Sequence, residues 1–81
     1  MRTQIQVLFG ERLSQLRAKQ KWSQEDLSER AQIGIKHISS LENGHREPCL
    51  NTIAKLAEAF GITASQLIKG LEGHPLNDKK A

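Results

Sequence analysis

The stretch from Ser23 to Gly44 has the pattern of two short amphipathic helices joined by a tight turn. Ser23 and Asp26 have the spacing of a capping box, in which each side chain accepts the backbone N–H of the other residue. A helix is therefore predicted to begin at Gln24. Apolar residues follow on one face of both predicted helices, namely Leu27, Ala31, Ile38 and Leu41, with Ile33 in the turn. The rest of the chain has to cover this apolar face.

A longer helix is predicted over residues 4–20, where apolar side chains recur at near-helical spacing. Gly10 lies inside it and costs about 1 kcal/mol relative to alanine. Either this helix frays at its first turn, which is the interpretation we favour here, or another backbone passes close to the glycine. Trp22 lies in the connection that follows. Its ring is expected to close the bottom of the hydrophobic core rather than to stack on a nucleic-acid base.

Two further helices are predicted after a loop that contains Pro48. The first runs from about Asn51 to Phe60 and ends at Gly61, and the second begins after Thr63, which has a capping-box partner at Gln66. The second continues through Ile68 with Leu67 packed inward. The fold class is thus predicted to be all-α, a compact five-helix bundle in residues 1–70. Residues 71–81 are expected to form a polar, mobile tail.

Size and composition limit the possible functions. The 81 residues suffice for one small domain, and the net charge of +3 is compatible with a nucleic-acid partner. Cys49 is the single cysteine, expected to be partly buried, so no internal disulfide forms and a reducing cytoplasm is the expected compartment. No apolar run approaches the roughly 20 residues of a membrane span. His37, His45 and His74 lack zinc-site spacing with this cysteine, so no metal, cofactor or enzymatic activity is expected.

Residues 12–67 resemble the helix-turn-helix of the Cro and phage-repressor type, also called the XRE family. The resemblance depends on motifs in a fixed order, which are Ser23–Leu27, Ala31, Ile38–Ser39 and Leu41–Gly44. The chain is also similar to the controller proteins of restriction-modification systems. This resemblance implies a phage-repressor DNA-binding fold with the helix-turn-helix at the second and third helices. It further implies a prokaryotic, sequence-specific regulator of transcription that binds double-stranded DNA.

The resemblance also implies which residues meet DNA. In this motif the second of the two short helices enters the major groove, where each base pair shows its own donor and acceptor pattern. The residues that correspond to base contacts are Ile35, Lys36, His37, Ser39 and Ser40. Those expected to hold phosphates are Ser23, Gln24, Asn43, His45 and Arg46. For Lys36, Arg46 and His45, an ordinary solvated side chain is the alternative interpretation.

Three further expectations concern the framework of the motif. By resemblance, Arg17 and Glu42 form a partly buried structural ion pair between the first helix and the end of the third. Gln32 stands where the turn usually has glycine, so it either adopts a left-handed conformation or the turn is of another kind. Gly34 replaces the usual serine or threonine cap of the third helix, at a cost of roughly a few tenths of a kcal/mol.

A single such domain reaches only one half-site, so a homodimer on a near-palindromic operator is expected. The predicted dimer interface contains Ile62, Leu67, Ile68 and Leu71. Contact with RNA polymerase is a further hypothesis, for which the acidic residues Glu25, Asp26 and Glu29 are candidates beside their role as a solvated face. The alternative function is an antitoxin-type interaction module whose DNA binding is autoregulatory, which a co-purifying toxin partner would favour.

Overall fold

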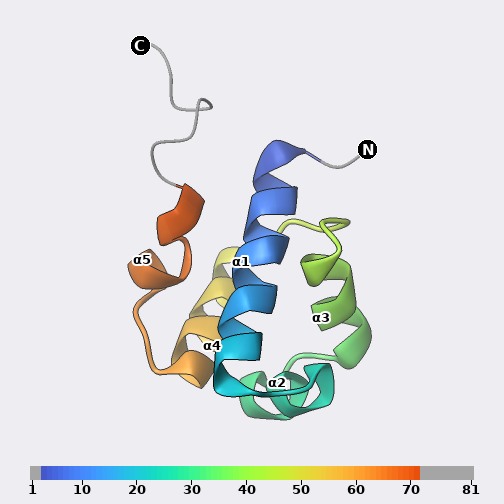
Figure 1. The fold of residues 1–81 in the computed structure, drawn as a ribbon, viewed down its shortest axis with the longest axis vertical. Coiled ribbons are helices and arrows are strands. Elements are labelled where there is room, and N and C mark those ends of the chain that lie inside the picture. The colour runs from blue at the N-terminus through green and yellow to red at the C-terminus, as the bar shows by residue number, and fades with distance from the viewer. Residues whose placement is uncertain (1–2, 72–81) are drawn as a thin grey trace.

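The computed structural model describes residues 3–71, and within that range the chain is helical without strands. The predicted polar tail lies outside the described residues, apart from Leu71. Residues 3–71 form five α-helices and one short 3₁₀ helix, and Figure 1 shows how the α-helices are arranged. Their bounds are α1 Gln4–Gln20, α2 Gln24–Ala31, α3 Ile35–Glu42, α4 Leu50–Phe60, α5 Ala64–Leu67 and η1 Lys69–Leu71. The all-α bundle predicted from the sequence is therefore confirmed.

Capping boxes set where three of these helices begin. At α2 the Ser23 hydroxyl accepts the Asp26 backbone N–H at 3.0 Å, and the Asp26 carboxylate accepts the Ser23 backbone N–H at 2.9 Å. The predicted box at Thr63 and Gln66 is present as well. Thr3 caps α1 in the same way, which the sequence analysis did not anticipate. These side chains satisfy N–H groups that a helix cannot pair internally, so they fix the helix starts.

Left-handed backbone ends three of the described helices, at Lys21 after α1, Gln32 after α2 and Gly61 after α4. Gln32 has φ 60° and ψ 44° after α2, which settles the alternatives left open for a non-glycine residue in this turn. Gly61 ends α4 as predicted, with φ 70°. Gly34 caps α3 without a side-chain hydrogen bond. The turn of the helix-turn-helix is thus built without a glycine in the left-handed position.

Gly10 is buried in the middle of α1, so the prediction that this end of the helix frays is wrong. A Cβ atom at Gly10 would lie 2.5 Å from the Glu42 carbonyl oxygen and 2.6 Å from the Leu41 carbonyl oxygen. The second interpretation holds, because the end of α3 passes directly against the backbone of α1. Only a residue without a side chain permits that approach.

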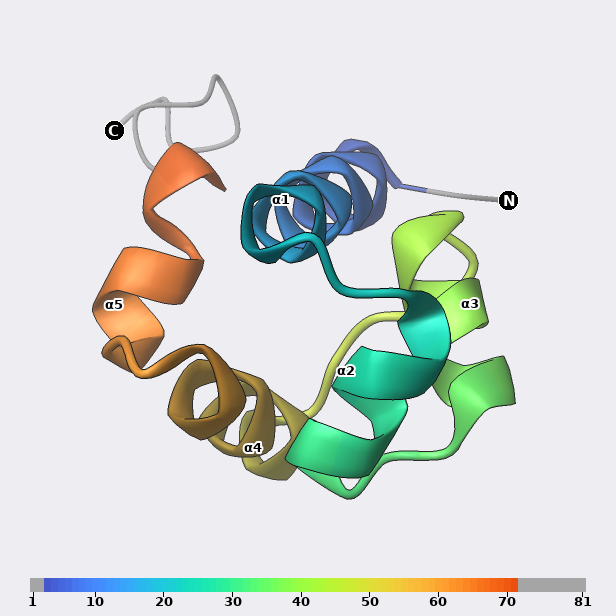
Figure 2. The ribbon, with the colours of Figure 1, turned by 60° about the horizontal axis from the view of Figure 1, so that its bottom comes forward.

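The core joins all five helices. In the described part of the chain, α1 packs against α3 and η1, α2 packs against α3 and α4, and α4 packs against α5. Figures 1 and 2 show α3 and α5 on opposite sides of α1, with α2 beside α3. The largest side chains with almost no exposed surface are Phe9, Leu13, Leu27, Ile38, Leu41, Leu56 and Leu67.

Trp22 has a structural position in the connection between α1 and α2. Its ring is stacked on Phe60, with ring centroids 5.3 Å apart and an interplanar angle of 17°. The Arg30 guanidinium lies 4.4 Å from the centroid of the same ring, within the range of a cation–π contact. The ring is therefore held between α2 and the end of α4, as the preferred interpretation requires.

Cys49 departs from expectation because it is exposed, not partly buried. It is the N-cap residue of α4, and its sulfur lies 3.3 Å from the Thr52 hydroxyl. Hydrogen bonding to Thr52 lowers the pKa of the Cys49 thiol. α4 begins at Leu50, one residue earlier than predicted. Cys49 therefore lies at the N-terminal end of α4, where its side chain faces solvent.

The cap of α2 predicts a pH dependence of stability. Hydrogen bonds from Ser23 lower the pKa of Asp26 in the folded protein. A lowered folded-state pKa means that the contribution is complete above the unfolded pKa and is lost as the pH falls through the folded value. Urea unfolding between about pH 6 and pH 2 should show a smaller loss of stability on acidification in Asp26→Asn than in the wild type. Glu25→Gln is the matched control, since it removes a carboxylate from the same turn but leaves the capping box intact.

Candidate nucleic-acid interface

One side of α3 is anchored in the core and the opposite side faces outward. Ile38 and Leu41 have no exposed surface, and their i, i+3 spacing fixes the rotation of the helix about its axis. Ile35 is 43% exposed although it is a large apolar residue, and Lys36 is exposed beside it. The first turn of α3 therefore presents one apolar and one cationic side chain to whatever lies outside.

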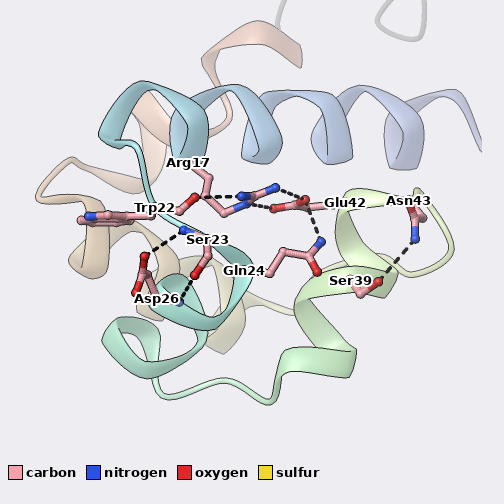
Figure 3. A network of polar contacts seen from close by, with 8 residues as sticks. All are labelled: Arg17, Trp22, Ser23, Gln24, Asp26, Ser39, Glu42 and Asn43. Carbon is pink, nitrogen blue, oxygen red and sulfur yellow. Dashed lines mark hydrogen bonds and ion pairs between the residues drawn. The ribbon is translucent and has the colours of Figure 1, made fainter.

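The other three predicted base-contact residues are half-buried. His37, Ser39 and Ser40 all lie on α3 with part of their surface open. The Asn43 side-chain amide donates to the Ser39 hydroxyl at 3.4 Å (Figure 3). The Ser40 carbonyl accepts the backbone N–H of His45 at 2.9 Å. The structure thus brings all five predicted residues onto one short helix, with the most open ones at its start.

Arg17 and Glu42 form an ion pair that ties α1 to the end of α3. Arg17 Nε donates to Glu42 Oε2 at 2.6 Å, and Arg17 Nη2 donates to Glu42 Oε1 at 3.0 Å. The Arg17 Nη1 group donates to the Trp22 carbonyl at 2.8 Å. The two side chains are 20% and 7% exposed, so the pair is largely shielded from water. The hydrogen bond to Glu42 raises the pKa of Arg17 further above its already high ordinary value.

Gln24 joins this pair, as Figure 3 shows. Its side-chain amide nitrogen donates to Glu42 Oε1 at 3.0 Å. One of its two amide N–H groups is therefore used inside the protein, which the sequence analysis did not foresee for a predicted phosphate contact. The same carboxylate thereby connects the first residue of α2 to the last residue of α3. This hydrogen bond ties the start of α2 to the end of α3 in a part-buried position.

The remaining predicted phosphate contacts lie just before α2 and just after α3. Ser23 is exposed, and its hydroxyl serves the capping box. Asn43, His45 and Arg46 are exposed in the loop that leaves α3. Gly44 turns that loop with φ 76° and donates its backbone N–H to the Leu41 carbonyl at 3.1 Å. Polar groups thus lie just before α2 and just after α3.

The predicted dimer residues do not all lie at the surface. Ile62, Ile68 and Leu71 are half-buried and pack against the core from outside. Leu67 has no exposed surface because it is part of the monomer's own core. The candidate dimer surface therefore has to be restricted to Ile62, Ile68 and Leu71.

Arg12 connects α1 to the end of α5, and the sequence pattern did not single it out. Its Nε donates to the Leu67 carbonyl at 3.1 Å, and its Nη2 donates to the Gln66 carbonyl at 2.7 Å. These carbonyls end the four-residue helix α5, where unpaired acceptors need a partner. No local pattern could have revealed these hydrogen bonds, because Gln66 and Leu67 lie 54 and 55 residues after Arg12 in the chain.

Other kinds of site find no support in residues 3–71. No group of three or more His, Cys, Asp or Glu side chains in this range converges to hold a metal ion. Within the same residues, no helix has both the length and the apolar character needed to cross a membrane. The exposed start of α3, with the polar groups before α2 and after α3, is the arrangement that points to a nucleic-acid partner.

A bundle whose second and third helices form a tight helix-turn-helix, with the third exposed along one side, defines a DNA-binding domain of the helix-turn-helix class. The model of one such family, described as a helix-turn-helix domain, matches residues 10–72. The chain belongs to this family of helix-turn-helix regulators of transcription.

The relatives are regulators of bacterial origin. The HTH-type transcriptional regulator DdrOP3 of Deinococcus deserti is 39% identical over 62 residues, which cover 76% of this chain and 48% of that protein. The chain thus spans about half the length of this relative. Control protein C.MunI of a Mycoplasma species is 35% identical, over 84% of this chain and 93% of its own length. The crystal structure of the restriction-modification controller protein C.AhdI from Aeromonas hydrophila superposes with a TM-score of 0.74 at 35% identity, covering 76% of this chain and 94% of that one.

Proposed function

We propose that this protein regulates transcription by binding a specific double-stranded DNA operator, and that α3 reads the operator in the major groove. The observation that carries the proposal is the orientation of α3. Ile38 and Leu41 are completely buried, while Ile35 and Lys36 at its first turn stand open to solvent. The major groove is about 12 Å wide and admits one helix presented in this way.

The side chains on α3 have suitable chemistry for reading bases. The Lys36 ammonium can donate to O6 and N7 of a guanine, and Ile35 can pack on the methyl group of a thymine. His37, Ser39 and Ser40 offer shorter hydrogen-bonding groups further along the helix. Since the exposed residues cluster at the start of α3, the N-terminal half of the helix would enter the groove first.

Contacts to phosphates would fix the register of α3. The N-terminus of α2 has backbone N–H groups and a favourable dipole for an anion, with Ser23 and Gln24 beside it. In our proposal, Glu42 holds the Gln24 amide through one N–H, and the second N–H meets a phosphate. Asn43, His45 and Arg46 would contact the backbone on the other side of α3. Such contacts position the protein but do not specify the sequence.

A homodimer on a near-palindromic operator completes the proposal. One α3 reaches a single half-site, and two of them about 34 Å apart would read two successive turns of DNA. Ile62, Ile68 and Leu71 supply half-buried apolar surface before and after α5. α5 lies on the side of α1 opposite α3 (Figure 2). The relation to the transcriptional regulator DdrOP3 and to the control protein C.MunI supports a role in the regulation of transcription. Contact with RNA polymerase stays a prediction.

Selection of bound fragments from random duplex DNA tests this proposal. The expected outcome is an enriched sequence with two inverted half-sites about one helical turn apart. Sedimentation equilibrium with the enriched duplex should then give two protomers per site. Enrichment of a single half-site, bound by one protomer, would contradict the homodimer, and absence of any enrichment would contradict sequence-specific binding.

Two substitutions separate base reading from phosphate contact. Lys36→Ala should weaken binding to the selected operator by about 1 to 3 kcal/mol and relax the preference at one position of each half-site. Arg46→Ala should weaken specific and random duplexes alike and flatten the dependence of affinity on salt. Both side chains are exposed, so neither change should affect folding. Fluorescence anisotropy with both duplexes over a salt series measures these effects, and equal losses on both duplexes for Lys36→Ala would refute its reading role.

A further inference from the structure

An apolar groove opens on the surface near the start of α4. Its volume is about 210 Å³. α1, the loop before α4, α4 itself and η1 all contribute to it, so it lies where four segments of the chain meet. The residues that line it are Ile5, Phe9, Glu47, Pro48, Ile53, Ile68 and Leu71. With six apolar residues and one carboxylate, the groove suits an apolar side chain better than a charged ligand.

Leu50 lies in the sequence between the lining residues Pro48 and Ile53, and 85% of its surface is exposed. It is the first residue of α4 and lies three positions before Ile53, so the two side chains share one side of the helix. Isolated exposed apolar residues are common, but this one follows closely in sequence on the lining of an apolar hollow that residues 3–71 leave unfilled. The same surface thus carries a projecting leucine and a cavity that can take one.

We infer that the groove receives Leu50 of a second copy of this chain, in a reciprocal contact about a two-fold axis. In a two-fold interface the same surface faces itself, so a projection and a hollow that lie side by side are filled together. This inference rests on the proposed function, because it assigns the contact through which the proposed homodimer forms. It also adds Leu50, Pro48 and Ile53 to the surface around Ile68 and Leu71.

The charges around the groove favour a second copy as the occupant. Glu47 lies in the lining, and Lys69 is exposed on η1 between the lining residues Ile68 and Leu71. A two-fold rotation about an axis between them sets the Glu47 of each copy against the Lys69 of the other. The loop from α3 to α4 ends at this groove, so the contact also couples the position of α3 in one subunit to that in the other.

Sedimentation equilibrium of Leu50→Glu against wild type tests the contact. Burial of one leucine corresponds to about a tenfold change in affinity or more, so the dimer Kd should rise at least about tenfold. Lys55→Glu is the control, because this residue is exposed on the same helix and gains the same side chain. Its dimer Kd should change by less than about threefold, the size of a typical surface charge effect. Circular dichroism should show both variants folded, since neither side chain is buried.

A cross-linking experiment identifies the occupant directly. Cys49 is exposed next to Leu50, and the lowered pKa of its thiol favours labelling with a maleimide that carries a photoreactive group. Illumination of an equal mixture of ¹⁴N and ¹⁵N protein should give mixed-isotope cross-links to the segments around Ile5 and residues 68–71. Cross-links of one isotope only to residues 72–81 would show that the chain's own end fills the groove, which overturns the inference.

The outcomes also separate this inference from the proposed function. A Leu50→Glu variant that dimerises as tightly as the wild type and binds the operator as a dimer would refute the groove contact and leave the homodimer standing. A wild-type protein that is monomeric, both free and on the operator, would refute the homodimer and this inference together. Weakened dimerisation of Leu50→Glu with a normal Lys55→Glu control supports both.

Discussion

Gly10→Ala is expected to destabilise the folded protein by about 3 kcal/mol, the upper part of the range for overpacking a core. In an exposed helix the same change would stabilise by about 1 kcal/mol, because alanine is the better helix former. Here the added Cβ would lie 2.5 Å from the Glu42 carbonyl oxygen, and that oxygen belongs to a backbone that cannot rotate aside. The clash forces α1 and α3 apart, and with them the core between the two helices.

Urea unfolding followed by circular dichroism measures this effect. Gly34→Ala is the control, because a Cβ at Gly34 meets nothing within 4 Å and its φ of −58° suits any residue. Its free energy of unfolding should change by less than about 1 kcal/mol, as for a cap position that already lacks a side chain. A Gly10→Ala variant as stable as the wild type would show that α1 and α3 are not in direct backbone contact.

Glu42→Ala should cost about 3 kcal/mol of stability, the size found when one partner of a shielded ion pair is removed. The Glu42 side chain is 7% exposed and accepts from both Arg17 and Gln24. Without it, the Arg17 guanidinium keeps only the Trp22 carbonyl among these partners and lies in a place shielded from water. The loss should therefore exceed that of an exposed pair, which is about 1 kcal/mol or less.

The double substitution Arg17→Met with Glu42→Leu is the matched control. Because it removes both charges and keeps apolar volume, it should recover most of the stability lost in Glu42→Ala. Operator affinity should fall in Glu42→Ala even at temperatures where the protein is folded, since the carboxylate also orients Gln24 and the end of α3. If Glu42→Ala lost less than about 1 kcal/mol, the pair would count as an ordinary surface contact.

Much of the fold could be predicted because local signals fix the helix ends. Ser23 with Asp26, and Thr63 with Gln66, act over three residues, and the structure contains both capping boxes. The predicted helix over residues 4–20 and the predicted helix start at Gln24 agree with α1 and α2. The inward positions of Ile38 and Leu41 follow from spacing alone, and they determine which side of α3 stays open.

The remaining features depend on contacts between segments far apart in the sequence. The role of Gly10 is set by the carbonyl groups of Leu41 and Glu42, more than thirty positions away. Leu67 is buried in the core, as its predicted inward packing requires, and its place in the predicted dimer interface conflicts with that packing. Leu50 was overlooked because the helix was expected to start one residue later, beyond it.

The open side of α3 is tested most directly by methylation interference on the selected operator. A methyl group on guanine N7 occupies the major groove, whereas one on adenine N3 occupies the minor groove. Premethylation of guanine N7 in both half-sites should block binding of the wild type, and Lys36→Ala should become insensitive at one guanine per half-site. Binding that tolerates every N7 methyl group but is lost on N3 methylation would contradict reading by α3 in the major groove.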